Sequence, residues 1–370
     1  MADILTTLRE LSVAYYFIEG DNVPSPQEFL NTCKNNISGC EYLNNDSISY
    51  SYDSFNTGEN SAIHNGFKLG QILKEKLHIS ENPYIKWTGS ETQSGSPVDL
   101  IIDSKKLSLK EHSNIIGNIG LYQMLNILTN TNNYKRGVHI FRDFAPREFN
   151  EWFETTRDIF INNYNDPILI NNNRYSSGLI YQNDILSLQY SKNGQPDTIN
   201  ITNFSSCDHA RYNNETNSLF REKVFSKWIN NYISSNSHYL NAKAKCAEAA
   251  GRNLLNLIYQ YKGTSPLLLT QLFRIEEDEY YYAKTTNNYV EIYKVPSIYN
   301  FSQNVLITDI QVSVPSSQLN LITVIENMQT AQKIEFRNEL RYSHGQLNGT
   351  PEAKFYKSTG ELSTIYQKII

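Results

Sequence analysis

The sequence predicts a mixed α/β (α+β) fold, in which a mixed central sheet is flanked by helices and joined to further helical regions and a C-terminal antiparallel β region. The first observation behind this prediction is a helical segment followed by a short strand and a tight hairpin between residues 61 and 110. The second is a set of further helical segments, and the third is the strand-like alternation that takes over after residue 279. At 370 residues the chain is long enough for two or three domains.

Two helices are expected before residue 50. One covers residues 5–17, and the other starts near Pro26, because a proline is tolerated in the first turn of a helix. A third helix is predicted over residues 61–77, where apolar and small residues repeat at helical spacing among charged ones. An extended segment, residues 83–87, then leads into the hairpin.

The hairpin between residues 96 and 110 is the most informative segment. An apolar run is followed by a polar stretch that can turn the chain and by a second run that ends at Lys110. Because side chains alternate between the two faces of a strand, Asp99 and Lys110 can converge if the strands pair in the simplest register. A carboxylate beside a lysine suits metal-dependent phosphodiester cleavage, since a hard divalent cation needs oxygen ligands and the lysine can orient or help deprotonate a water.

Beyond the hairpin the sequence predicts another helix and another strand. Residues 117–130 are apolar except for a few polar side chains, among them Gln123, at intervals of three and four, which indicates one polar stripe on a mostly buried helix. Residues 137–141 are expected to form a strand. The remaining predicted elements are a hairpin around Asn193-Gly194, helices over 219–233 and 241–261, and strands around 287–288, over 305–314 and within 334–357.

The order helix, three strands, helix and strand over residues 55–145 resembles the core of the PD-(D/E)xK nuclease superfamily. Asp99 in Pro97-Val98-Asp99 matches the metal-binding aspartate, with one residue inserted after the proline, and Lys110 in Ser108-Leu109-Lys110 matches the catalytic lysine. Ser108 stands where the family usually has Asp or Glu, and a serine hydroxyl is a poor ligand for a hard cation. Some type II restriction endonucleases look similar and take a glutamate from the following helix.

The resemblance implies a Mg²⁺ site, with Mn²⁺ as a substitute, at Asp99, Leu109 and a carboxylate from elsewhere in the chain. Glu75 on the preceding predicted helix is the first candidate for this carboxylate and Glu59 is the second. Gln123 can add a neutral amide oxygen. Glu75 lies among lysines and can simply be solvated, and Gln123 can satisfy a buried polar group instead. The residues expected in the catalytic centre are Asp99, Lys110, Ser108, Glu75 and Gln123.

The resemblance also organises the chain into four expected regions. These are an N-terminal helical region, 1–54; a PD-(D/E)xK nuclease core, 55–165; a hairpin and helical region, 166–265; and a C-terminal β-rich region, 266–370, to which DNA recognition is assigned. The candidate DNA contacts are Lys105, Lys106, His112, Arg341 and His344. A homodimer would match a palindromic double-stranded target by symmetry.

The composition permits this function. Charged residues make up 19% of the chain and the formal net charge is -5, which argues against indiscriminate nucleic-acid binding but leaves room for a basic cleft. No apolar segment is long enough to span a bilayer, the start does not resemble a secretory signal, and the four cysteines form no Cys-x-x-Cys pair. We therefore expect a cytoplasmic protein of prokaryotic or viral origin with reduced thiols.

Signatures of other enzyme classes are absent from the sequence. It contains no phosphate loop, dinucleotide-binding glycine motif, His-Glu-x-x-His motif or nucleophile elbow. The expected function is sequence-specific, metal-dependent cleavage of double-stranded DNA, of the kind that type II restriction endonucleases perform in restriction-modification systems. The alternatives are a noncatalytic DNA-binding or assembly protein on a degenerate nuclease fold, and a metal-dependent RNA nuclease.

Overall fold

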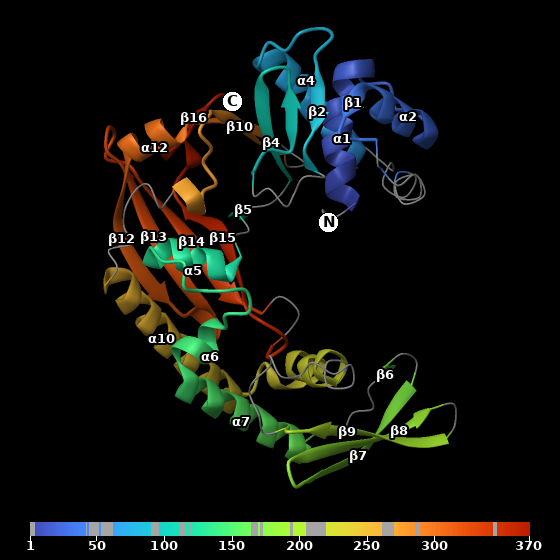
Figure 1. Cartoon of the computed structure of the whole chain (residues 1–370), viewed down its shortest axis with the longest axis vertical. Helices are drawn as coiled ribbons and strands as arrows, with labels where there is room; N and C mark the ends of the chain where they lie inside the picture. The colour runs from blue at the N-terminus through green and yellow to red at the C-terminus, as the bar shows by residue number, and fades with distance from the viewer. Residues whose placement is uncertain are drawn as a thin grey trace.

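The computed structural model shows a mixed α+β fold with three sheets in the described part of the chain (Figure 1). The described residues are 4–41, 43, 52, 62–89, 96–111, 115–117, 120–163, 169–170, 173–192, 195–204, 220–260, 270–285, 289–342 and 346–370. The central sheet is mixed and flanked by helices, as the sequence predicts, and the other two sheets are antiparallel. No helix among the described residues combines the length and the apolar character needed to cross a membrane.

The central sheet has seven strands in the order β1-β2-β3-β4-β10-β11-β16. They are β1 (Ile37–Ser38), β2 (Ile85–Trp87), β3 (Leu100–Ile102), β4 (Lys105–Glu111), β10 (Tyr280–Thr285), β11 (Val290–Val295) and β16 (Gln367–Lys368). Strands β2, β3 and β4 form an antiparallel meander, whereas β10 is parallel to β4. The chain therefore leaves this sheet after β4, builds much of the rest of the molecule, and returns to it at β10.

Three helices, α1 (Ile4–Glu19), α2 (Pro26–Asn36) and α4 (Ala62–Lys76), share one hydrophobic core with the central sheet. Helix α2 begins with a capping box, in which Ser25 and Glu28 satisfy each other's main-chain N–H groups. Helices α1 and α4 approach closely at Gly66. A Cβ atom there would lie 2.5 Å from the Cβ of Ser12 and 2.8 Å from the carbonyl oxygen of Arg9, so only glycine permits this crossing. This crossing fixes the position of the middle of α1.

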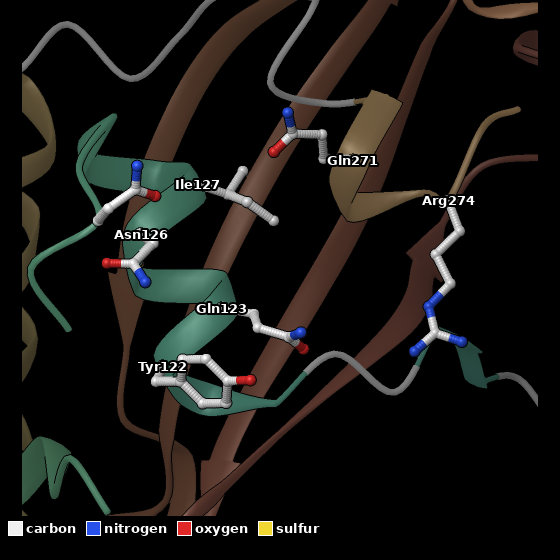
Figure 2. A pocket seen from close by; sticks show the side chains of 7 residues that line it. Tyr122, Gln123, Asn126, Ile127, Gln271 and Arg274 are labelled. Carbon is white, nitrogen blue, oxygen red and sulfur yellow. The ribbon is translucent and has the colours of Figure 1, made fainter. Parts of the chain in front are cut away.

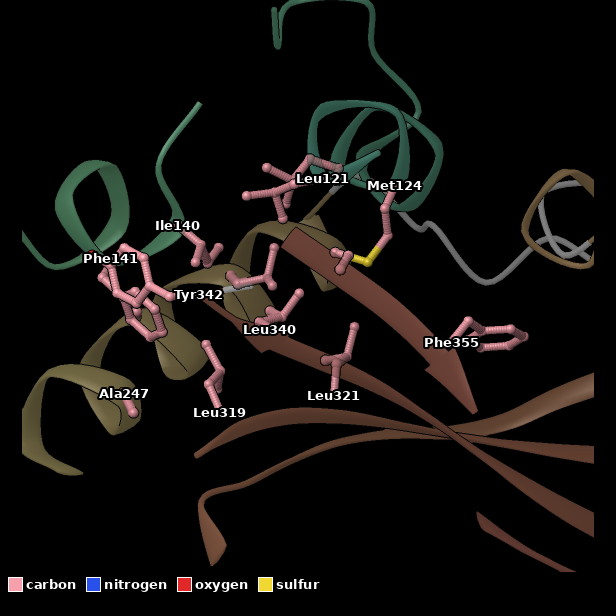
Figure 3. Packing of buried hydrophobic residues seen from close by; sticks show 14 of the residues in the cluster. Leu121, Met124, Ile140, Phe141, Ala247, Leu319, Leu321, Leu340, Tyr342 and Phe355 are labelled. Carbon is pink, nitrogen blue, oxygen red and sulfur yellow. The ribbon is translucent and has the colours of Figure 1, made fainter. Parts of the chain in front are cut away.

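The five-stranded sheet has the order β12-β13-β14-β15-β5. Its strands are β12 (Val305–Ser313), β13 (Leu319–Asn327), β14 (Lys333–Arg341), β15 (Glu352–Thr359) and β5 (Ile115–Gly117). Side chains alternate between buried and partly exposed along β14, because one face of this sheet is covered. Figure 3 shows Leu121 and Met124 of α5 (Leu121–Thr129) and Ala247 of α10 (Ser237–Gln260) near sheet residues such as Leu321 and Leu340. Gly251 lets α10 approach the sheet, since a Cβ atom there would lie 2.5 Å from Val312.

The third sheet, β6-β7-β8-β9, lies away from the central sheet (Figure 1). Its strands are β6 (Leu169–Ile170), β7 (Asn173–Gln182), β8 (Ile185–Lys192) and β9 (Gln195–Thr202), and β8 and β9 form the hairpin predicted around Asn193-Gly194. The preceding helix α7 (Pro146–Asn163) contributes Phe160 to an aromatic cluster with Phe204 and Trp228. Trp228 belongs to a helical run composed of η3 (Arg221–Phe225), α9 (Ser226–Trp228) and η4 (Ile229–Ile233), which confirms the helix predicted over 219–233.

One prediction for the segment after the hairpin is wrong. Residues 137–141 do not form a strand, because His139 caps a short helix, α6 (Ile140–Phe144), by accepting a hydrogen bond from the main-chain N of Arg142. The helix predicted over 117–130 is present as α5, although it starts at Leu121, and it packs on the five-stranded sheet. The second neighbour of β4 in the central sheet, after β3, is β10. Because β10 is far from β4 in the sequence, the order of adjacent segments could not predict this pairing.

The remaining elements agree with the expected order. Helices near 5–17 and 241–261 are confirmed as α1 and α10, and the strands after residue 279 are present, with α12 (Ile298–Asn304) preceding β12. The central sheet takes strands from three of the four expected regions, 1–54, 55–165 and 266–370. The described cysteines, Cys33, Cys40 and Cys246, are buried free thiols, as expected for reduced cysteines.

Candidate active site

Asp99 and Lys110 converge beside the β3–β4 pair, as the sequence predicts. Asp99 directly precedes β3, and its Oδ2 atom accepts a hydrogen bond from the main-chain N of Leu109 at 2.6 Å. The Nζ atom of Lys110 lies 3.5 Å from the same oxygen. The carboxylate thus takes a main-chain N–H at the point where the short strand β3 begins. Both side chains stay partly exposed, at 19% for Asp99 and 28% for Lys110, so the pair can be reached from solvent.

A third charged residue, Glu10 from the middle of α1, faces this pair. Its side chain is buried, and its Oε2 atom accepts a hydrogen bond from Nε1 of Trp87 on β2 at 2.8 Å. Burial raises the pKa of the Glu10 carboxyl from 4.5 to about 7, and the negative charge of Asp99 adds to the rise. The Trp87 hydrogen bond and the positive charges of Lys110 and Arg9 oppose the rise without cancelling it. Glu10 therefore sits in the field of both Asp99 and Lys110.

The local backbone is built around the contact between Glu10 and Trp87. A Cβ atom on Gly89 would lie 2.4 Å from Nε1 of Trp87 and 2.7 Å from Oε2 of Glu10. Only a glycine allows the chain to pass so close to this hydrogen bond. The close crossing of α1 and α4 at Gly66 fixes the same carboxylate from the other direction, because Gly66 contacts α1 at Arg9 and Ser12, on either side of Glu10.

Glu10 was not among the residues predicted from the sequence. Glu10 is far from the hairpin in the sequence, and only the packing of α1 on the central sheet brings the two together. One signal was present, since Arg9 and Glu10 are the only charged residues between positions 4 and 18. A charged pair in the middle of an otherwise uncharged, largely buried helix indicates a polar site on the buried side.

The other predicted ligands are placed differently. Glu75 is 70% exposed and forms an ion pair with Lys76 at 2.7 Å, so its carboxylate is a solvated group on α4. The structure therefore places Glu75 on the solvent-facing side of α4, away from the core that this helix shares with the sheet. Ser108 is buried on β4 and offers no carboxylate. Gln123 is exposed on α5 and accepts a hydrogen bond from the N of Gly120. Glu59 lies outside the described residues.

The predicted DNA contacts are mostly engaged with other groups. Lys106 forms ion pairs with Asp278 at 2.9 Å and with Glu276 at 3.7 Å, which neutralise its charge. Arg341 lies 3.6 Å from Glu339 and 3.8 Å from Glu352 on the exposed face of the five-stranded sheet. Lys105 lies over the ring of Tyr281, with its Nζ atom 5.9 Å from the ring centroid. His112 and His344 lie outside the described residues.

Two further cations border the site. Lys284 of β10 is paired in register with Lys110 of β4, so the two lysines are neighbours on adjacent parallel strands, and Lys284 is largely buried. Arg274, in the segment before β10, is half-buried. Burial lowers the pKa of its guanidinium, and interactions with Tyr280 and with the carboxylate of Asp99 oppose that change, which places Arg274 within electrostatic reach of Asp99.

The oxygen donors at this site fit a hard divalent cation. No group of three or more His, Cys, Asp or Glu side chains in the described ranges could hold a metal ion. Asp99 and Glu10 nevertheless provide two carboxylates, and Leu109 remains a candidate through its carbonyl oxygen. Mg²⁺ commonly uses one or two protein carboxylates and completes its shell with water and substrate phosphate. The buried Glu10 carboxyl has a pKa of about 7 and interacts with the carboxylate of Asp99. A cation bound here would relieve the repulsion between the two carboxylates.

Comparisons with known proteins do not assign the chain to a family. No family model matches it, and searches of the curated proteins and of the solved structures gave no match. The geometry of the site and the order of its strands are therefore the observations on which a function can be argued.

Proposed function

We propose that this chain is a Mg²⁺-dependent endonuclease that hydrolyses phosphodiester bonds of double-stranded DNA at specific sequences, in the manner of type II restriction endonucleases. The meeting of Asp99, Lys110 and Glu10 beside the β3–β4 pair carries this proposal. The antiparallel meander β2-β3-β4, with β10 parallel to β4, supports a PD-(D/E)xK core, in which β10 takes the place that the sequence had assigned to residues 137–141.

Each residue has a distinct role in this proposal. Asp99 and Glu10 would hold the cation, and the N–H of Leu109 orients Asp99 by donating to its Oδ2 atom. The contact between Lys110 and Asp99 is long for an ion pair, at 3.5 Å. The Lys110 ammonium can therefore also donate to a phosphate oxygen or position the attacking water. When bound, the cation supplies Lewis-acid stabilisation of the phosphate charge and a more acidic water. Glu10, with its pKa near 7, can release its proton when the cation arrives.

The test is cleavage of mixed-sequence duplex DNA in magnesium, with chelator as the blank. Asp99→Asn and Lys110→Ala should each lower cleavage by roughly 10³-fold or more, which corresponds to about 4 kcal/mol of barrier. Lys333→Ala is the matched control, because Lys333 is an exposed lysine of β14, paired with Glu326, and should cleave as the parent does. Near-parental cleavage by both site variants would reject the assignment of these residues.

The products identify the kind of nuclease. Defined fragment ends indicate sequence specificity, and random ends remove it. A mass in solution that doubles on target DNA supports a homodimer, which a palindromic target would favour. Cleavage of duplex RNA instead of DNA would replace the substrate and leave the catalytic residues in place. Magnesium-independent DNA binding without any cleavage would point to the noncatalytic alternative, for which the buried Ser108 in place of a carboxylate is the specific observation.

A further inference from the structure

An open pocket of about 410 Å³ lies between α5 and the segment that leads into β10, and one of its lining residues, Arg274, is within electrostatic reach of Asp99 (Figure 2). Its described lining includes the polar stripe of α5, with Tyr122 and Gln123, and residues Gln271 and Arg274. Figure 2 shows the side chains of Gln123 and Gln271 reaching toward the same space from opposite sides, with Arg274 at the far edge. The volume falls within the range of about 300–1,000 Å³ that is usual for small-molecule sites.

The pocket is physically connected to Asp99 in two ways. Arg274 lines the pocket and lies within the electrostatic field of Asp99. Ser96, three residues before Asp99, donates a short hydrogen bond to Glu276, two residues after Arg274. Arg274 and the Ser96–Glu276 hydrogen bond therefore link the pocket to the segment that carries Asp99.

The backbone at Arg274 adopts a conformation that a side chain disfavours. Its φ angle is 51°, in the left-handed region where glycine is the usual residue. The preceding turn closes through a hydrogen bond from the N of Ile275 to the O of Thr270 at 2.8 Å, which is the position where a helix normally ends in glycine. This turn holds Arg274 at the edge of the pocket that its side chain lines.

The chemistry of the lining selects a flat, neutral ligand with hydrogen-bonding edges. Gln123, Gln271 and Asn132 each carry an amide that can both donate and accept, and no carboxylate or lysine is among the described lining residues. Tyr122 adds an aromatic ring and Ile127 an apolar surface. A nucleobase has this combination of a flat face and a mixed donor and acceptor edge, and proteins read unstacked bases by such contacts.

We propose that this pocket receives one unstacked base of the DNA strand whose phosphate lies at Asp99, with Arg274 holding the intervening backbone phosphate. The inference rests on the proposed nuclease function, because it places the strand at Asp99. Gln123 and Gln271 read the edge of the base, and Tyr122 lies against its face. Recognition of one base beside the scissile bond would then come from the α5 segment and the segment before β10.

The test measures binding separately from cleavage. Short single-stranded oligonucleotides of dA, dC, dG or dT, and a duplex with one mismatched 2-aminopurine, are titrated in chelator with the full chain. The wild type should prefer one base, and the double variant Gln123→Ala, Gln271→Ala should bind that base roughly tenfold more weakly and lose the preference. Arg274→Ala should weaken all four equally, as expected for a phosphate contact. Gln182→Ala, at an exposed glutamine of β7, is the control and should bind as the wild type does.

The outcomes separate the two proposals. The pocket proposal is overturned if the wild type shows no preference among the bases, or if the double variant keeps both affinity and preference. A rise of 2-aminopurine fluorescence on binding to the wild type, absent from the double variant, supports an unstacked base. Cleavage is measured separately, for the wild type and the variants, on the mixed-sequence duplex DNA in magnesium. Cleavage with unaltered binding by the variants would reject the pocket and keep the nuclease, whereas altered binding without any cleavage would keep the pocket and reject the nuclease.

Discussion

Replacing Glu10 with glutamine should stabilise the protein at alkaline pH and should remove the metal-dependent cleavage proposed above. The substitution keeps the size of the side chain and an oxygen that can accept the hydrogen bond from Nε1 of Trp87. It removes only the ability to become negatively charged. In the structure that charge is unfavourable, because the carboxyl is buried beside Asp99.

The magnitude follows from the pKa of Glu10. A folded-state pKa of about 7 against an ordinary value of 4.5 means that the folded state holds the proton more tightly than the unfolded chain does. The stability contributed by this group is therefore complete below pH 4.5 and is lost as the pH rises through 7. Since one pH unit corresponds to about 1.36 kcal/mol, the loss amounts to about 3 kcal/mol. The Glu10→Gln variant has no titrating group at this position, so its stability should exceed that of the wild type by up to this amount above about pH 8.

Urea unfolding in chelator, at about pH 5 and about pH 8.5, measures the difference in free energy of unfolding between the two proteins. Glu75→Gln is the control, because that carboxylate is exposed and should show no such pH dependence. Magnesium should raise the stability of the wild type at the higher pH and leave that of Glu10→Gln nearly unchanged. A difference that is equal at both pH values, or a variant less stable than the wild type at the higher pH, would refute the account of Glu10.

Two further predictions concern the packing that supports the site. Gly66→Ala should lower the free energy of unfolding by about 1–3 kcal/mol, since its Cβ atom would lie 2.8 Å from the carbonyl oxygen of Arg9. Because the substitution displaces α1, it should also reduce the pH dependence of stability that is assigned to Glu10, as measured by the same urea titrations. Tyr342→Phe removes a buried hydroxyl that lies 2.8 Å from Nε2 of His139, so it should cost about 1–3 kcal/mol in thermal or urea unfolding. The Tyr342 effect should be the same from about pH 6 to 8, because burial lowers the pKa of His139 to about 3, and cleavage in magnesium should persist. An unchanged stability in either variant would contradict the corresponding contact.

Local signals in the sequence were sufficient for most individual elements. Pro26 and Asn193-Gly194 predict a helix start and a hairpin through the backbone preferences of single residues, and helix α2 and the β8–β9 strand pair are both present. The polar stripe predicted on residues 117–130 exists on α5, with Leu121 and Met124 buried opposite it. The sheet on which this helix packs could not be predicted from local signals. The central sheet continues from β4 to β10, which is far along the sequence, and the pairing of these two strands depends on contacts across a long insertion.

The segment around His139 shows how a short apolar run can mislead. Residues 137–141 contain too few positions to distinguish a period of two from one of 3.6, so alternation favoured a strand. The deciding interaction is a cap, in which the His139 side chain accepts from the N of Arg142 and Asp143 accepts from the N of His139. Histidine is not among the common capping residues, and this signal was therefore absent from a reading based on residue type.

For the candidate site, the sequence indicated Asp99 and Lys110 because they are joined by one hairpin, and their convergence is confirmed. The source of the second carboxylate could not be chosen from the sequence, since it depends on which helix packs beside the start of β3. Proximity in the chain favours Glu75, whose helix adjoins the hairpin, but α4 presents that residue to solvent. Helix α1 reaches the same region from the beginning of the chain through its crossing with α4 at Gly66.

The direction of the Glu10 pKa separates a structural ion pair from a site that awaits a ligand. A carboxylate in a satisfied ion-pair network has a lowered pKa, because its cations outweigh the cost of burial. Lys110 and Arg9 act on Glu10 in that direction, yet burial and Asp99 prevail, and the pKa is raised. A glutamine at this position, which keeps an acceptor for Nε1 of Trp87, would be better for stability alone. A divalent cation bound by Glu10 and Asp99, as the proposed function requires, would supply the positive charge that opposes this rise, and it would account for an acid at this point of α1.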